Sequence, residues 1–246
     1  MCIVAIAWQL FKELPVVVLS NRDEFLHRPS QKAHHWQNGI WAGQDEQAGG
    51  TWLGMHPQTG RWAVVLNYRE VVANKPVFGT SRGRLVTEFL RGTLSPMATA
   101  RRLPLHAYDG FNLVMGDTTQ AVLINNKGYA ATALPAGLYV LSNGNPDDAW
   151  YKCERLRARV RQEILPLLAT QHAWHDHAFE VLQDSVMSSD HQLPSTGVPH
   201  QVEKALSSIF IPSERMTSLF AKPYGTQVST IMTLGQTNEL VERWHH

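Results

Sequence analysis

Two short runs rich in valine and isoleucine open the chain, at Cys2–Trp8 and Leu14–Ser20. Runs of this length and composition are typical of strands, and Phe11–Glu13 can turn the chain between them into a hairpin. A second hairpin is predicted from Trp52–His56 and Arg61–Asn67. The N-terminal third of the chain is therefore predicted to be β structure.

Helical patterns follow these strands. Ser81 is placed to cap a helix at Arg82–Arg91, where Leu85, Phe89 and Leu90 share one face. The other predicted helices start at Ser95-Pro96, run from a cap at Asp147 or Asp148 to about Leu168, and cover Ala178–Met187. Further strands are predicted at Asn112–Gly116, Ala121–Asn125, Leu138–Ser142, Gln227–Leu234 and Glu239–Trp244. This order excludes a simple alternating βαβ fold and indicates an α+β fold with largely antiparallel sheets.

Composition is that of an ordinary globular protein, with 246 residues, 43% hydrophobic and 17% charged. The net charge is +1 without a basic tract, so no nucleic-acid partner is expected. The N-terminus lacks the basic segment of a signal peptide, and no apolar run approaches the roughly 18 residues of a membrane span. The two cysteines, Cys2 and Cys153, are too few for a disulfide framework. We therefore expect a cytoplasmic protein whose residues 1–246 form one domain.

Cys2, directly behind the initiator methionine, is chemically special. Removal of Met1, which a small second residue permits, leaves a thiol and a free α-amine on one residue. The amine, with a reference pKa of about 7.7–8.0, can take the proton of a thiol whose reference pKa is about 8.5. A cysteine at the start of an apolar strand is also commonly a small buried hydrophobic residue. Both interpretations stay open on this residue alone.

The motif Asn21-Arg22-Asp23-Glu24 comes at the end of the second apolar run. Because that run is expected to pair with Cys2–Trp8, the motif can return to the neighbourhood of Cys2. Arg22 can then lower the pKa of the thiol, and Asp23 can accept hydrogen bonds from the α-ammonium or the thiol. The alternative is a surface turn, in which ion pairs are worth about 0–1 kcal/mol.

An ordered series of short motifs gives the sequence a family resemblance. The series comprises Asn21-Arg22-Asp23-Glu24, Arg28-Pro29, Gly49-Gly50-Thr51-Trp52-Leu53-Gly54, Leu66-Asn67-Tyr68-Arg69, Ser81-Arg82-Gly83, Gly110-Phe111-Asn112-Leu113, Leu141-Ser142-Asn143-Gly144, Leu193-Pro194-Ser195-Thr196-Gly197 and Tyr224-Gly225-Thr226. In this order the motifs resemble those of the NRDE-motif family, also called the transport-and-Golgi-organisation-2 family. That family in turn resembles the N-terminal-nucleophile (Ntn) hydrolases, in particular the choloylglycine and penicillin V amidases.

The resemblance implies a fold and a set of site residues. The fold is an Ntn-hydrolase-like αββα sandwich, with two stacked, mainly antiparallel sheets flanked by helices. Cys2 matches the nucleophile of the amidases, and Arg22 and Asp23 resemble the residues that flank it in their second strand. Asn67 resembles their oxyanion-hole asparagine, and Asn143 a second asparagine that orients the amine or the oxyanion. Such a donor is worth about 3–4 kcal/mol in catalysis, although asparagine is also a common turn residue.

One position departs from the family pattern. After Tyr224-Gly225-Thr226 the family and the amidases commonly carry an arginine, and Gln227 stands there instead. A positive charge that would support catalysis or bind an anionic group is therefore missing at this position.

The resemblance also implies intracellular haem trafficking, with links to lipid and acyl-coenzyme A metabolism. A haem carrier requires a loose apolar slot and at most a weak axial ligand. Four tryptophans can line such a slot or form an ordinary aromatic core: Trp36, Trp41, Trp52 and Trp62. A histidine series at His172, His175 and His177 lacks an obvious fourth ligand, so no metal site is predicted.

Two functions of different classes follow. In the first, the chain is a haem chaperone or carrier that binds haem, or another small apolar or amphipathic ligand, and passes haem to apo-haemoproteins. In the second, it is a metal-independent amidohydrolase or acyl-transfer enzyme acting on C–N bonds, with a site formed by Cys2, Arg22, Asp23, Asn67 and Asn143. A third, weaker alternative is an acyl-coenzyme A or lipid binder without turnover.

Overall fold

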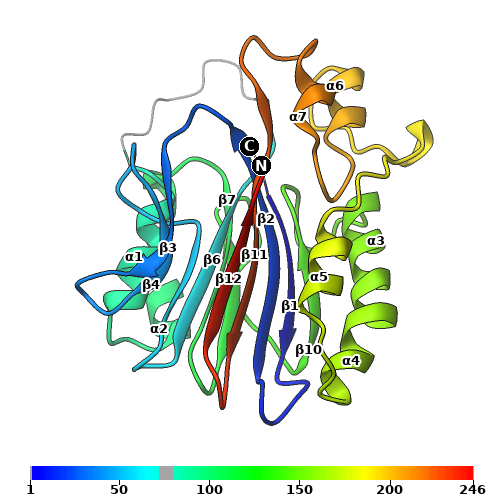
Figure 1. The fold of residues 1–246 in the computed structure, drawn as a ribbon. Helices are drawn as coiled ribbons and strands as arrows, with labels where there is room; N and C mark the ends of the chain where they lie inside the picture. Colours follow the sequence, from blue (N-terminus) through cyan, green and yellow to red (C-terminus); the bar gives the residue numbers. More distant parts are fainter. Residues whose placement is uncertain (1, 72–79, 246) are drawn as a thin grey trace.

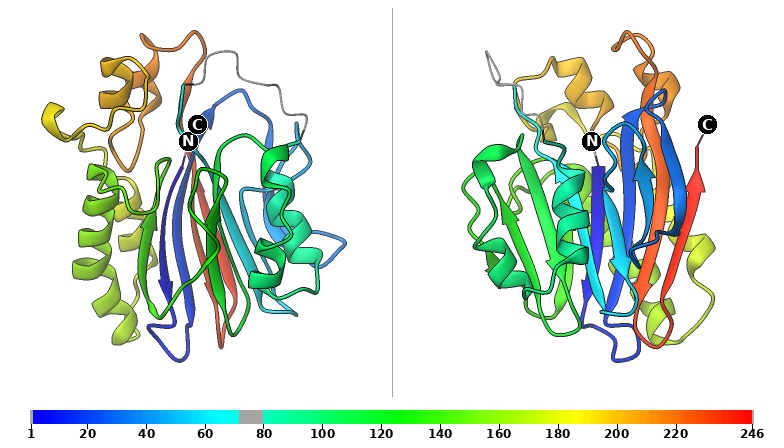
Figure 2. Two further views of the ribbon diagram at one scale, coloured as in Figure 1. Left: turned by 180° about the vertical axis from the view of Figure 1, so that it is seen from behind. Right: turned by 90° about the vertical axis from the view of Figure 1, so that its left-hand side faces the viewer.

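The strands form two antiparallel sheets that stack face to face, and helices cover both outer faces (Figure 1). The computed structural model describes residues 2–71 and 80–245. The order helix, sheet, sheet, helix can be followed from two further directions in Figure 2. The predicted α+β class, with two stacked and mainly antiparallel sheets, is confirmed.

The five-stranded sheet joins the two ends of the chain. Its strand order is β10 (Gly137–Leu141), β1 (Cys2–Trp8), β2 (Val16–Phe25), β11 (Tyr224–Leu234) and β12 (Glu239–Trp244). β1 and β2 form the predicted N-terminal hairpin, in which Trp8 lies opposite Val16 and Cys2 opposite Arg22. β2 runs on beyond the predicted end at Ser20, because β11 pairs with it as far as Phe25.

The seven-stranded sheet contains the second predicted hairpin, β5 and β6. Its strand order is β3 (Ser30–His35), β4 (Trp41–Asp45), β5 (Leu53–His56), β6 (Arg61–Asn67), β7 (Phe111–Gly116), β8 (Ala121–Asn125) and β9 (Thr132–Ala133). Strands β3 and β4 come from the tryptophan-rich segment and were not predicted. They form one edge of the seven-stranded sheet, and β3 begins five residues after the strand that contains the Asn21–Glu24 motif ends.

Two groups of helices cover the sheets. On the seven-stranded sheet lie α1 (Gly83–Arg91) and α2 (Pro96–Ala100). On the five-stranded sheet lie α3 (Tyr151–Arg159), a π-helical turn (Val160–Ile164), α4 (Leu165–Ala169) and α5 (His175–Leu182), the last in place of the predicted Ala178–Met187. Short helices α6 (His200–Ala205) and α7 (Ser213–Met216) lie at the end of the sandwich where β1 begins (Figure 1). No helix within the described residues is long and apolar enough to cross a bilayer.

The long helix begins later than predicted. Its first residue is Tyr151, and no side chain caps it, so the predicted cap at Asp147 or Asp148 is wrong. The Asp148 carboxylate instead accepts a hydrogen bond from the Asn145 N–H at 2.8 Å, in the preceding turn. An aspartate near a helix start can satisfy a turn as readily as a helix end, and here the turn prevails.

The caps of the first two helices differ from each other. Ser95 caps α2 as predicted, because its Oγ accepts a hydrogen bond from the Ala98 N–H at 3.3 Å. Ser81 does not cap α1 in this way. Its Oγ accepts from the Gly83 N–H, two residues along, so α1 starts at Gly83 without a side-chain cap.

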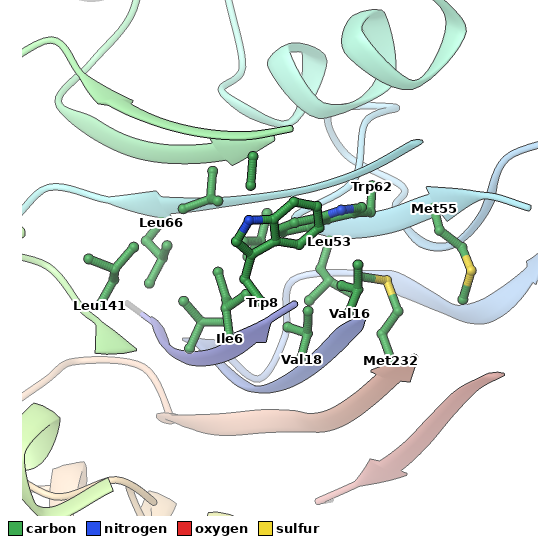
Figure 3. Close-up of a cluster of buried hydrophobic side chains, with 14 of the residues drawn as sticks. Ile6, Trp8, Val16, Val18, Leu53, Met55, Trp62, Leu66, Leu141 and Met232 are labelled. Carbon is green, nitrogen blue, oxygen red and sulfur yellow. The ribbon is translucent and has the colours of Figure 1, made fainter. Parts of the chain in front are cut away.

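Strand alternation divides the core into layers. Cys2 and Trp8 face the space between the two sheets, whereas Ile3 and Ala5 face the helices on the five-stranded sheet. Figure 3 shows the inter-sheet core, in which the rings of Trp8 and Trp62 have centroids 5.9 Å apart. This alternation places Cys2 on the inter-sheet face, at the very end of its strand.

Candidate functional site

The motif Asn21–Glu24 lies inside strand β2. Asn21, Arg22 and Asp23 are at most 5% exposed. A solvated surface turn is therefore the wrong description of this segment. The prediction that the motif returns to Cys2 is confirmed, since Cys2 and Arg22 are directly paired across the β1–β2 ladder.

Successive residues of the motif face opposite sides of the sheet. Arg22 points toward the seven-stranded sheet, where it contacts Asp45. Asn21 points toward the helical layer, and its Nδ2 donates to the carbonyls of Leu182 at 2.8 Å and Ile209 at 3.0 Å. Asn21 therefore fixes β2 to the helical layer, while Arg22 serves the space beside Cys2.

A cavity of about 110 Å³ opens beside Cys2. Residues from both sheets and from the start of α1 line it: Cys2, Arg22, Asp23, Glu24, Arg28, Asp45, Thr51, Trp52, Val65, Asn67, Ser81, Arg82 and Gly83. Three arginines and three carboxylates are among them, so the cavity is polar and charged. The predicted site residues Cys2, Arg22, Asp23 and Asn67 all reach it.

Arg22 is held in a fixed position at the wall of this cavity. Its Nη2 lies 3.2 Å from Asp45 Oδ2, and its guanidinium carbon is 4.4 Å from the centroid of the Trp52 ring. Arg28 Nε binds the same Asp45 oxygen at 2.7 Å. Glu24, the last residue of the motif, is half-buried, with Oε2 3.9 Å from Arg28 Nε. These contacts orient the cation that lies opposite Cys2.

Cys2 as a residue is 8% exposed, and burial raises the pKa of its thiol. The charge of Arg22 and a hydrogen bond from the backbone N–H of Asp23 act in the opposite direction. Burial is the largest of these effects, so the thiol is protonated at neutral pH. A base has to remove its proton before the sulfur can attack a substrate.

Asp23 is enclosed between β2, β11 and the helical layer. Its Oδ1 accepts a hydrogen bond from Thr226 Oγ1 at 2.8 Å, and Tyr224 Oη donates to its backbone carbonyl at 3.2 Å. Burial raises the pKa of Asp23, whereas the charge of Lys152, the hydrogen bond from Thr226 and the charge of Arg69 lower it. Cations from two other elements therefore stabilise the charged carboxylate.

Asn67 and Asn143 meet beside the cavity. Asn143 Nδ2 donates to the Asn67 carbonyl at 2.8 Å, and the Arg69 N–H donates to the Asn143 carbonyl at 2.6 Å. Ser142 Oγ donates to the Cys2 carbonyl at 2.8 Å. Asn67 is half-buried and lines the cavity, whereas Asn143 is fully buried. Asn143 thus holds the backbone of Asn67 in place, and the adjacent residue Ser142 holds the backbone of Cys2.

Gln227 stands at a β-bulge, where the pairing of β11 with β2 shifts between Thr226 and Val228. Its buried side chain donates from Nε2 to the Arg28 carbonyl at 3.0 Å. The side chain of Gln227 therefore ties β11 to the segment after the motif.

Three residues of this site were not predicted as site residues from the sequence: Asp45, which pairs with Arg22, and Arg82 and Lys152. Arg82 lines the cavity, and its Nη1 donates to the Gly110 carbonyl at 3.0 Å. Lys152 is 1% exposed in the first turn of α3. Its spacing of four residues from Leu156 places it on the buried stripe of that helix, and this spacing could have identified it.

Of the four tryptophans considered for a haem slot, Trp41, Trp52 and Trp62 lie in or against the inter-sheet core, and Trp36 lies apart from them. Trp62 is fully enclosed in the inter-sheet core, and Trp36 packs with α1 on the outer face of the seven-stranded sheet. Trp52 lines the Cys2 cavity. Within residues 2–71 and 80–245, no three histidine, cysteine, aspartate or glutamate side chains are placed to share a metal ion.

A larger groove of about 610 Å³ is lined by the residues that follow Asn67 and Asn143. Its walls carry aromatic, charged and loop residues: Tyr68, Arg69, Glu70, Gly144, Asp148, Ala149, Trp150, His191, Gln192, Leu193, Pro194, Ser195 and Thr196. The residues that follow the two asparagines therefore line a groove large enough for a drug-sized ligand, in addition to the small polar cavity beside Cys2.

Comparison with known proteins gives one consistent result. A family model described as Transport and Golgi organisation 2 matches residues 1–243. The human protein named Transport and Golgi organization protein 2 homolog is 30% identical over 239 residues, covering 88% of this chain and 81% of the human one. The similarly named bovine and mouse proteins are 28% and 29% identical, with the same coverage.

Proposed function

The chain belongs to the Transport and Golgi organisation 2 family, and we propose that it uses Cys2 as an N-terminal nucleophile in the cleavage or transfer of acyl groups held by C–N bonds. The observation that carries the proposal is the shared cavity, which Cys2, the fixed cation Arg22 and Asn67 all line. The sequence motifs resemble a family that is similar to the Ntn hydrolases, and the helix–sheet–sheet–helix layering expected of those enzymes also supports the proposal. Both cysteines are free thiols, which suits a reducing compartment, and we place the activity in the cytoplasm.

The proposed reaction has two steps. After removal of Met1, the α-amine of Cys2 takes the thiol proton and the sulfur attacks the substrate carbonyl. The C–N bond breaks, the leaving nitrogen receives that proton, and a thioester remains on Cys2. Water then hydrolyses the thioester, which restores the thiol and releases a carboxylate. Asp23 holds the amine, Arg22 stabilises the thiolate, and Asn67, braced by Asn143, donates to the oxyanion.

Covalent labelling tests this function directly. Incubation with p-nitrophenyl acetate should release p-nitrophenol and add one acetyl group at Cys2 of a protein that has lost Met1, as read by intact mass and peptide mapping. Cys2→Ala should abolish the adduct. Cys153→Ala is the matched control and should keep it, because Cys153 is 4% exposed and burial raises the pKa of its thiol to about 11. Labelling that persists in Cys2→Ala, or a reactive protein that retains Met1, would contradict the proposal.

Haem carriage is the second candidate, and the groove of about 610 Å³ is the feature that favours it. Ligand sites typically measure about 300–1,000 Å³, so this groove suits a large flat ligand better than the Cys2 cavity does. Tyr68, Trp150 and His191 supply aromatic walls. In this proposal haem, or another amphipathic ligand, binds the groove and passes to an apo-haemoprotein.

A spectroscopic titration separates the two candidates. If the groove carries haem, wild type and Cys2→Ala should shift the Soret band of micromolar haemin equally. Both should then transfer the haem to apomyoglobin. His191→Ala should weaken the shift, since His191 is an imidazole in the wall of the groove. An unchanged Soret band at these concentrations would exclude haem as the cargo and leave the Cys2 proposal unaffected.

A further inference from the structure

Lys152 is a lysine that the fold buries almost completely. It is 1% exposed, and within the described part of the chain its Nζ has no hydrogen-bond partner. It belongs to the first turn of α3, which packs against β1 and β10. Burying an ammonium group without such a partner costs free energy, and most lysines in proteins are exposed for that reason. Its position therefore calls for an electrostatic reason.

The charged groups around Lys152 come from several elements. Asp23 of β2 faces the same layer between the five-stranded sheet and the helices, as its neighbour Asn21 does. Arg69 lines the same small cavity of about 10 Å³ as Lys152, and its guanidinium carbon lies 4.9 Å from the centroid of the Trp150 ring. The thiols of Cys2 and Cys153 also act on Lys152, Glu203 is the ion-pair partner of Arg69, and Tyr224 contacts Asp23. Asp23 is the carboxylate in this group that Lys152 can serve.

We propose that Lys152 is a positioning residue of the Cys2 site, whose buried ammonium keeps the Asp23 carboxylate charged so that it can hold the α-amine of Cys2. The inference rests on the proposed function of Cys2 for its purpose, but the pairing of the two charges can be measured separately. Lys152 touches no reacting atom in this proposal. It acts only through Asp23.

The charge balance around Asp23 favours this role over a merely structural one. Arg69 already bears a direct ion pair to Glu203, with Nη1 2.5 Å from Oε2. The Nζ of Lys152, by contrast, has no hydrogen-bond partner among the described residues, and its charge lowers the pKa of Asp23 more than that of Arg69 does. Burial alone raises the pKa of Asp23, and Lys152 is the first side chain that opposes it. A neutral Asp23 could not anchor an ammonium, and the amine would lose its fixed position next to the thiol.

Carbon-13 NMR of the Asp23 carboxyl group, followed across pH, tests the pairing. Lys152→Met removes the charge at similar volume and should raise the proton affinity of Asp23 about tenfold or more, as expected when a nearby opposite charge is lost. Lys152→Arg should restore the wild-type titration. Lys12→Met, the same change at the exposed far end of the β1–β2 hairpin, is the matched control and should leave it unchanged. An Asp23 titration in Lys152→Met that superimposes on wild type would overturn the proposal.

A functional readout distinguishes positioning from support of the fold. In Lys152→Met, the rate of Cys2 acetylation by p-nitrophenyl acetate should fall on the acid side of its pH profile, because Asp23 is then protonated at higher pH. Lys152→Arg should restore the wild-type profile. A shifted Asp23 titration with an unchanged acetylation profile would disprove the positioning role. If wild-type Cys2 forms no adduct at any pH, the proposed function fails, while the Asp23 titration still decides the pairing.

A reciprocal variant covers the case in which Lys152→Met does not fold. Coupling between two sites acts equally in both directions. Asp23→Asn should therefore lower the pKa of Lys152 further, which the nitrogen-15 signal of its Nζ reports. A Lys152 titration that is the same in wild type and Asp23→Asn would exclude the pair.

Discussion

Replacing Glu203 with alanine is expected to lower the free energy of unfolding by about 3–5 kcal/mol, the usual result of removing one partner of a buried ion pair. Glu203 is 3% exposed, and its Oε2 lies 2.5 Å from Arg69 Nη1. Its other oxygen accepts hydrogen bonds from the N–H and the hydroxyl of Thr196. The substitution therefore leaves a buried guanidinium and two loop donors without this acceptor. Urea unfolding, with the slope held in common, measures the change.

Two variants calibrate this result. Glu203→Gln keeps an acceptor for Thr196 but removes the charge, so its effect should fall between those of wild type and Glu203→Ala. Glu214→Ala, an exposed glutamate in the neighbouring helix α7, should change stability by less than about 0.5 kcal/mol. A loss below about 1 kcal/mol in Glu203→Ala would mean that water replaces the pair, and that the pair is not buried in solution.

The same ion pair is coupled to the site through the backbone. Arg69 follows Asn67 by two residues, and its N–H donates to the Asn143 carbonyl. Movement of Arg69 would loosen the contact by which Asn143 holds Asn67. Glu203→Ala should therefore also slow acetylation of Cys2, whereas Glu214→Ala should not. A stability loss that leaves the labelling rate unchanged would show that the two asparagines are held independently of the pair.

The parts of the fold that the sequence predicted are those determined by local pattern. Short strand-like runs and the turns between them identified both hairpins, β1–β2 and β5–β6, and capping chemistry identified the start of α2 at Ser95. The motif Asn21–Glu24 was harder to place, because four polar residues are untypical of a buried strand. Partners distant in sequence make this strand possible, among them Leu182 and Ile209, whose carbonyls accept from Asn21.

The candidate site was predicted only in part for the same physical reason. Cys2 and Arg22 could be brought together from the sequence, since hairpin pairing is a local property. Arg82 and Lys152 reach the site through the packing of α1 and α3 on different sheets, which no local pattern specifies. A lysine among the arginines of α3 also resembles the solvated face of a helix. Only its spacing from Leu156 distinguishes it.

Lys152→Met is expected to raise the free energy of unfolding by about 3 kcal/mol at pH 7. Burial lowers the pKa of Lys152 from its ordinary value to about 8, and the neighbouring charge of Arg69 acts in the same direction. At pH 7 the lysine is charged in both the folded and the unfolded chain, so the folded state bears the full cost of holding that charge. A methionine of similar length fills the space without this cost.

The pH dependence gives the sign of the effect. Between about pH 8 and the unfolded value near 10.4, the folded chain loses the Lys152 proton before the unfolded chain does. The unfolded state then binds more protons, so the contribution of Lys152 to stability rises with pH across this window. The difference between Lys152→Met and wild type should therefore be largest at pH 7 and close to zero near pH 10.5. Urea unfolding at several pH values measures it, and Lys12→Met, the exposed control, should show no such trend.

The two effects of Lys152→Met have opposite consequences, and their combination is the informative result. A variant that is more stable at pH 7, yet binds a proton at Asp23 more tightly and acetylates Cys2 more slowly, would show that the fold retains an unfavourable buried charge because the site requires it. A variant that is less stable at pH 7 would instead mean that attraction to Asp23 outweighs desolvation. In that case Lys152 and Asp23 form a stabilising pair, and the pKa of Lys152 in the folded chain lies above its unfolded value of about 10.4. The stability difference at pH 7 thus decides between two roles of Lys152. Either its buried charge stabilises the folded protein, or the charge destabilises the protein and serves Asp23.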